Sequence, residues 1–261
     1  MPGSIAPTEE VLEFLRSKDP SKREKKIDEL LESIPPDIVM YLVNAIHFRG
    51  DWRSRFDRDR TAQAPFTTLD GGEVQVDMMA GDVGYRVLFR ADATIAELPY
   101  GGAAFSAVAA LPALGVTMDE FLAGLGPDRW ADWMAGLEAQ AAAEDLDEEG
   151  ILVRLPKIEL EWGADLIEPM QAIGMVDAFD PDAADFTRLT GGKHLYIQQA
   201  LQKTFLKVDE EGTEAAAATA VGFGPTSLPP SASFDRPFVL AIRERLSGTI
   251  LFIGVIGDPR G

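Results

Sequence analysis

One segment near the C-terminal end constrains this 261-residue chain more than any other. Its first part, Asp209–Ala220, has acidic residues around a glycine, followed by small residues that include four consecutive alanines. Its second part, Val221–Pro230, contains two glycines and three prolines and predicts a loop or a sheet edge. Upstream, Leu195–Ile197 and Thr204–Val208 are rich in β-branched and aromatic residues and predict a strand. A strand therefore leads into a long loop that begins with almost no side-chain bulk, as expected for a segment that fits a tight place or changes conformation.

The alanine run has two interpretations. Alanine is the strongest helix former, and Thr213 is a suitable cap, so the run taken alone favours a short helix. The strand before it and the ordered motifs elsewhere in the chain favour an extended hinge instead.

Those motifs occur in a fixed order along the chain. They are Leu42–Trp52, Phe56-Asp57, Pro65-Phe66, Val76–Met79, Glu97–Tyr100, Leu155–Lys157, Leu166-Ile167, Ile173–Met175, Ala184–Phe186, Asp235–Phe238 and Ile250–Gly254. Together with Glu210–Thr219, the series resembles the serpins, a family of protease inhibitors that trap their target by inserting a loop into a sheet. The resemblance covers roughly residues 24 to 259. It implies an α+β fold, the serpin fold, with a large central β-sheet and additional sheets and helices.

The resemblance also divides the chain. Residues 1–261 are expected to form one partial serpin domain, in which 1–23 do not match and 24–208 form the core. Residues 209–230 are the hinge and reactive-centre loop, and 231–259 are the C-terminal strands. Serpins have several helices and strands before the region that Leu42-Val43-Asn44 resembles, so roughly the first third of the fold is expected to be missing.

The function implied by the resemblance is suicide inhibition of a serine protease. The hinge residues are Glu210, Glu211, Gly212, Thr213, Glu214, Ala215, Ala216, Ala217, Ala218 and Thr219. Counting from the hinge glutamate as in the family places the reactive bond between Thr226 and Ser227. A threonine before the bond suits an elastase-like or subtilisin-like protease, and Phe223 is the second choice, for a chymotrypsin-like enzyme.

Three residues match the region where serpins open their sheet. Trp52 corresponds to the tryptophan near the start of insertion, and Asn44 lies in the preceding strand motif. Gln202 stands where many relatives carry a histidine in the hydrogen-bond cluster that gates opening. Glutamine donates and accepts hydrogen bonds but does not titrate near neutrality.

Enzymatic and metal chemistry have little support. The two histidines, His47 and His194, have no cysteine near them, and the chain lacks a nucleophile elbow, a P-loop and a dinucleotide fingerprint. Glu144–Gly150 lacks the ligand spacing of a calcium loop, and Asp180, Asp182 and Asp185 are interpreted as a solvated loop. We expect no enzyme, no cofactor and no metal.

The net charge and the composition limit the kinds of molecule that the protein is expected to bind. The formal net charge of −19 disfavours nucleic acid, and no apolar run is long enough to span a membrane. Cysteine is absent, so cysteine usage does not indicate whether the protein resides in an oxidising or a reducing compartment. No signal peptide is visible; the family resemblance favours an extracellular protein, with a cytoplasmic one as the alternative.

Hydrophobic periodicity predicts further elements. The expected strands are Val39–Phe48, Val74–Val76, Tyr85–Phe89, Thr94–Leu98, Phe105–Leu111 and the hairpin of Phe238–Ile242 with Thr249–Ile256; the expected helices are Met118–Leu125, Arg129–Gln140 and Asp165–Ile173.

Two functional alternatives remain open. One is a serpin-fold binding or storage protein without inhibitory activity, against which the small hinge residues argue. The other is a fragment that does not inhibit, which the short N-terminal part favours. With that part missing, Val39–Phe48 and Leu195–Val208 are expected to expose unpaired edges and to promote self-association.

Overall fold

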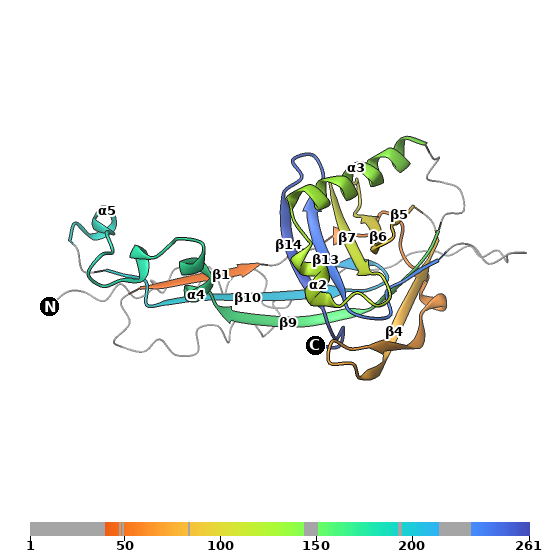
Figure 1. Ribbon diagram of the computed structural model, residues 1–261, viewed down its shortest axis with the longest axis horizontal. Helices are drawn as coiled ribbons and strands as arrows, with labels where there is room; N and C mark the ends of the chain where they lie inside the picture. Colours follow the sequence, from red (N-terminus) through yellow and green to blue (C-terminus); the bar gives the residue numbers. More distant parts are fainter. Residues whose placement is uncertain are drawn as a thin grey trace, which may run out of the picture. The chain divides into compact units, whose positions relative to one another are not determined.

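The computed structural model describes residues 40–46, 48, 50–82, 84–143, 151–192, 195–213 and 231–261 (Figure 1). The chain forms two compact units, each built from separated stretches of sequence. The first contains residues 1–47 and 161–205, and the second contains 48–160 and 206–261. Strands β9 (Ile158–Asp165) and β10 (Gln199–Val208) both cross the boundary between these stretches. Strands and helices are mixed, as the predicted α+β class requires.

The first unit is built on a three-stranded sheet with the order β1-β10-β9. Strand β1 (Tyr41–Ile46) runs parallel to β10 through six paired residues. The short helices α4 (Ile167–Ala172), η3 (Asp177–Phe179) and α5 (Thr187–Thr190) belong to the same unit. Buried Phe179, Ile197 and Ala200 form its hydrophobic cluster.

The second unit contains two larger sheets. The four-stranded sheet has the order β12-β8-β4-β3 and consists of β12 (Ser231–Ser233), β8 (Leu152–Pro156), β4 (Glu73–Gly81) and β3 (Ala62–Thr67). The five-stranded sheet has the order β14-β13-β7-β6-β5 and consists of β14 (Ile250–Ile256), β13 (Phe238–Glu244), β7 (Phe105–Pro112), β6 (Ala93–Pro99) and β5 (Arg86–Phe89). The remaining elements are β2 (Gly50–Asp51), η2 (Arg58–Arg60), α2 (Met118–Ala123), α3 (Pro127–Ala143) and β11 (Gly212–Thr213).

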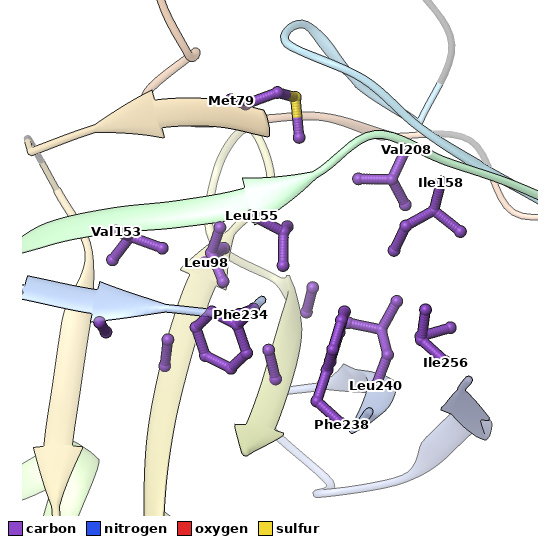
Figure 2. Packing of buried hydrophobic residues seen from close by; sticks show 14 of the residues in the cluster. Met79, Leu98, Val153, Leu155, Ile158, Val208, Phe234, Phe238, Leu240 and Ile256 are labelled. Carbon is purple, nitrogen blue, oxygen red and sulfur yellow. The ribbon is translucent and has the colours of Figure 1, made fainter. Parts of the chain in front are cut away.

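Strand β13 in the five-stranded sheet is buried on both faces, which explains its continuous apolar run. Side chains alternate between the faces of a strand. Phe238, Leu240 and Ile242 therefore join the core shared with the four-stranded sheet. Figure 2 shows Phe238 and Leu240 in this core. Val239 points to the opposite face, where Phe121 of α2 and Trp133 of α3 cover the sheet.

Most of the strands and helices expected from periodicity are confirmed, including the hairpin of β13 and β14. Strand β4 is longer than the expected Val74–Val76, because its ladder continues to Gly81 opposite β8. Helix α4 begins at Ile167 rather than at Asp165, since the Asp165 carboxylate accepts a hydrogen bond from the Ile167 amide at 2.8 Å. Strand β3 contains Pro65 and lies at a sheet edge, where a residue without an amide hydrogen is tolerated.

Two expectations for Leu195–Val208 are wrong. Leu195–Ile197 precede the strand, and the Ile197 amide donates to the Ala178 carbonyl at 2.9 Å instead of to a ladder. Strand β10 lies between β1 and β9, so the expected unpaired edge is absent over Gln199–Thr204, where β1 pairs with it. Over the described ranges, β1 and β9 are the edge strands of this sheet.

Candidate functional site

The segment Asp209–Thr213, here called the hinge base, turns the chain back after β10. The Asp209 amide donates to the Gly212 carbonyl at 3.0 Å, and the Gly212 amide donates to the Asp209 carbonyl at 3.3 Å. The Asp209 carboxylate accepts from the Glu211 amide at 2.9 Å. After this reversal, β11 pairs antiparallel with β2, with Gly212 opposite Asp51 and Thr213 opposite Gly50.

Trp52 holds the hinge base through its indole and its backbone. The indole Nε1 donates to the Asp209 carbonyl at 2.9 Å, and the Trp52 amide donates to the Glu211 carbonyl at 2.8 Å. The Phe56 amide adds a bond to the Glu210 carbonyl at 2.9 Å. The Trp52 ring is 3% exposed and stacks on Tyr100, with ring centroids 4.4 Å apart. The indole is thus fixed on one side by packing and on the other by the start of the loop.

Gly212 occurs where another residue would not fit. Its φ of +138° lies in a region that side chains disfavour, and a Cβ there would collide with the Gly50 carbonyl oxygen. Gly50 is also constrained, because a Cβ at that position would lie 3.0 Å from the Tyr100 ring. The two glycines let the β11 and β2 backbones approach each other beside packed aromatic rings.

Two buried carboxylates tie the hinge base to the rest of the second unit. Glu210, 5% exposed, accepts hydrogen bonds from the Lys157 ammonium and the Thr61 hydroxyl, both at 2.8 Å. Burial opposes ionisation of Glu210, but the bonds from Lys157 and Thr61 outweigh it and hold its pKa below the ordinary value. Glu211, also 5% exposed, forms an ion pair with Arg58.

The sheet-opening residues fall in both units. Asn44 of β1 lies directly opposite Gln202 of β10 in the parallel ladder. The Gln202 amide donates to the Thr204 hydroxyl at 3.3 Å, and Asn44 is exposed. Trp52 belongs to the second unit, where it makes the hinge-base contacts.

Several expected site residues lie outside the described residues. They are Glu214, Ala215, Ala216, Ala217, Ala218 and Thr219 of the hinge, Thr226 and Ser227 of the reactive bond, Phe223, both histidines and the segment Glu144–Gly150.

The aspartates that were considered as metal ligands accept hydrogen bonds from residues close to them in sequence. The Asp180 carboxylate accepts from the Asp182 amide at 2.8 Å, and Asp185 accepts from the Thr187 hydroxyl at 2.7 Å. In the part of the chain that the structure describes, no group of three metal-ligating side chains is gathered. None of the helices described there combines the length and apolar character needed to cross a membrane.

Sequence reasoning missed the side chains that bind the hinge glutamates. Arg58 and Thr61 belong to none of the motifs, and Lys157 was noted only as part of Leu155–Lys157. Thr61 lies 149 positions from Glu210, and Arg58 lies 153 positions from Glu211. No local pattern could therefore reveal these contacts.

Comparisons with known proteins agree on one family. The family model described as "Serpin (serine protease inhibitor)" matches residues 20–259. Human Serpin B11 is 31% identical over 258 residues, which cover 97% of this chain and 64% of that protein. The chain thus spans somewhat less than two thirds of this relative.

Solved structures give the same result. The native state of the thermophilic serpin tengpin has a TM-score of 0.78 and 29% identity, covering 95% of this chain and 62% of that one. Human thyroxine-binding globulin in complex with thyroxine also has a TM-score of 0.78, with 28% identity, covering 97% of this chain and 64% of that one.

We predict that Gly212→Ala loosens the hinge base. The new Cβ would collide with the Gly50 carbonyl, so β11 must move away from β2. Hydrogen exchange of the Trp52 amide, which donates to Glu211, should accelerate about fivefold or more, since clashes of this kind typically cost ~1 kcal/mol or more. Gly248→Ala is the matched control, because Gly248 also has positive φ but a Cβ at that position would meet no atom within 4 Å. Equal exchange in both variants would contradict the assignment.

We predict a pH-dependent contribution from Glu210. Its folded pKa lies below the ordinary value of 4.5, so its stabilising effect is full above that value and is lost as the pH falls through the folded pKa. Glu210→Gln should therefore lower the urea concentration at the midpoint of unfolding at neutral pH. Between about pH 5 and about pH 3, this midpoint should change less in the variant than in the wild type. Glu138→Gln, in α3 and away from the hinge base, serves as control. The same pH profile for wild type and Glu210→Gln would refute the prediction.

Proposed function

The chain belongs to the serpin family. We propose that it is a suicide inhibitor of serine proteases and that its reactive-centre loop is the segment that the target protease cuts. A protease would cut the exposed loop as a substrate, and the hinge would then enter the sheet as a new strand while still carrying the acylated enzyme. The observation that carries this proposal is the hinge base: β11 already pairs with β2, while β1 and β10 pair directly with each other. Pairing of the first hinge residues with β2 suits a loop whose insertion would start at this end.

The ladder between β11 and β2 suggests the register of insertion. Gly212 and Thr213 pair with Asp51 and Gly50, and only three residues separate β2 from β1. Continuing the same antiparallel register would place Ala217 opposite Ile46 and Thr219 opposite Asn44. Insertion would therefore have to break the β1–β10 pairs, including the Asn44–Gln202 pair.

The hinge composition suits this movement. In an inserted strand, Thr213, Ala215 and Ala217 would share one face of the sheet, and Glu214 and Ala216 the other. Apart from Glu214, these side chains are small, so little bulk or charge has to enter. Gln202, which does not titrate near neutrality, would make the opening step less sensitive to pH than a histidine would.

We propose Thr226-Ser227 as the reactive bond and an elastase-like or subtilisin-like protease as the partner. The family register and the small threonine side chain support this choice. Cleavage after Phe223 by a chymotrypsin-like enzyme is the second candidate, although it would shorten the inserted strand by three residues. We propose an extracellular location on the family resemblance alone.

A binding function without inhibition is the alternative that one comparison favours. Thyroxine-binding globulin, whose structure is similar over 97% of this chain, was solved with a bound small molecule. The small hinge residues support the inhibitory proposal over this alternative. Transplanting the loop into an inhibitory serpin separates the two.

Cleavage of the 261-residue chain by an elastase-like protease should release a C-terminal peptide that begins at Ser227. Mass spectrometry of this peptide identifies the bond. Thr226→Arg should abolish this cut and allow a trypsin-like protease to cut the same bond. A peptide that begins at Gly224 would support the Phe223 alternative, and one that begins elsewhere would exclude the register.

Inhibition is best tested by placing Gly212–Ser227 in a full-length inhibitory serpin. We expect this chimera to form a covalent complex that survives a denaturing gel. Thr213→Arg in the chimera should raise the stoichiometry of inhibition about tenfold or more, because burying an unpaired guanidinium costs several kcal/mol. Thr213→Val, a substitution of similar size without charge, should have little effect. If the protease cuts the chimera but forms no covalent complex with it, the binding function is favoured. If Thr213→Arg leaves the stoichiometry of inhibition unchanged, Thr213 is excluded as an inserting residue.

We expect the 261 residues alone to self-associate and to form no stable protease complex. Strands β1 and β9 are sheet edges in the described part of the first unit, and Trp162 on β9 is 52% exposed. Light scattering should give a mass above that of one chain, and Trp162→Lys should lower it because charged edge residues oppose strand pairing. Leu189→Lys, at a 69% exposed position in α5, is the control. A monomer that also traps the protease would overturn this expectation.

A further inference from the structure

A charged cluster lies within the five-stranded sheet, apart from the hinge base. Four adjacent strands contribute to it: Arg86 from β5, Glu97 from β6, Ser106 from β7 and Arg243 from β13. Arg86 and Glu97 are direct cross-strand partners, as are Arg243 and Ser106. Arg245 follows the end of β13. We call Arg86, Arg243, Arg245 and Glu97 the arginine cluster.

Strand alternation places this cluster on the face that α2 and α3 cover. Arg86 is two residues from Leu88, and Glu97 is two residues from Ile95, and both apolar residues belong to the cluster under these helices. The charged side chains therefore continue an otherwise apolar layer. Arg86 is 6% exposed, Arg243 is 2% exposed and Glu97 is fully buried.

One carboxylate holds three guanidinium groups. Glu97 accepts from Arg86 at 2.8 Å and from Arg243 at 2.9 Å, and the Ser106 hydroxyl donates to it at 2.8 Å. The Nε of Arg245 lies 3.3 Å from the same carboxylate, without the alignment of a hydrogen bond, and its Nη1 donates to the Ala103 carbonyl at 3.1 Å. Burial opposes ionisation of Glu97, but the bonds from Arg243 and Ser106 prevail and keep its pKa below the ordinary value.

The cluster is short of negative charge and of acceptors. Among the described residues, Arg86, Arg243 and Arg245 contact one carboxylate, that of Glu97, since the carboxylate of the neighbouring Glu244 accepts from the turn that follows β13. The Nε–H groups of Arg86, Arg243 and Arg245 are buried and make no hydrogen bond within the described protein. Buried donors are nearly always paired, and uncompensated buried charges are strongly unfavourable. A further anionic acceptor would correct both deficits at once.

We propose that the arginine cluster binds a small oxyanion, a carboxylate or a phosphate or sulfate group. Guanidinium groups present several N–H donors in one plane and match the oxygens of such anions. The anion approaches from the Arg245 side, since this side chain is 22% exposed whereas those of Arg86 and Arg243 are 6% and 3% exposed. The bond to Ala103 keeps the Arg245 guanidinium in position.

Equilibrium dialysis of the 261-residue chain against radiolabelled inorganic phosphate tests the proposal, with chloride holding the ionic strength constant. We expect saturable binding of one phosphate per chain. Competition with sulfate and with acetate then distinguishes a tetrahedral oxyanion from a carboxylate. At a phosphate concentration of about 100 times Kd, the unfolding equilibrium should shift about 100-fold towards the folded state.

Substitutions locate the binding. Arg86→Met and Arg86→Lys should both lose it, because lysine retains the charge but lacks the Nε–H and the planar fork. Arg90→Met is the matched control: Arg90 is exposed and pairs with Asp132 at 3.1 Å, outside the cluster. Arg245→Met, at the more exposed position, provides a second test if Arg86→Met does not fold. Absence of saturable binding by wild type, or equal binding by the Arg86→Met and Arg90→Met variants, would overturn the proposal.

Discussion

The hydrogen bonds between the hinge base and Trp52 fix the backbone of Asp209–Glu211 in the second unit. The indole Nε1 binds the Asp209 carbonyl at 2.9 Å, and the Trp52 amide binds the Glu211 carbonyl at 2.8 Å. These bonds keep β11 against β2 while β1 and β10 stay paired. In the proposed mechanism, insertion would start from this hinge end, and these contacts would set its register.

The hinge base combines a close backbone approach at Gly212 with ion pairs of two buried glutamates. Gly212 permits a backbone approach that a Cβ would block, while the glutamates beside it are buried and paired with Lys157 and Arg58. The alanines that follow have no side chain long enough to make such bonds. In the proposed mechanism, these alanines would therefore add no side-chain hydrogen bond that opposes insertion.

Much of the fold could be predicted from local sequence. The apolar runs Phe238–Ile242 and Thr249–Ile256 predicted the hairpin that the structure contains, and the helical periodicity of Arg129–Gln140 predicted α3. Strand β3 was missed because Pro65 is untypical of strands. Leu195–Ile197 were assigned to a strand because composition cannot reveal that the Ile197 amide binds the Ala178 carbonyl.

The sequence by itself determined the family, the ordered motifs and the small side chains of the hinge, because these depend on residue type and order. Only the tertiary structure decided which charges meet. Thr61 and Lys157 converge on Glu210, and strands β5, β6 and β13 bring the arginine cluster together around Glu97. Such contacts join residues far apart in the chain, and their energies depend on burial and distance, which strand order and register set and which no local pattern encodes.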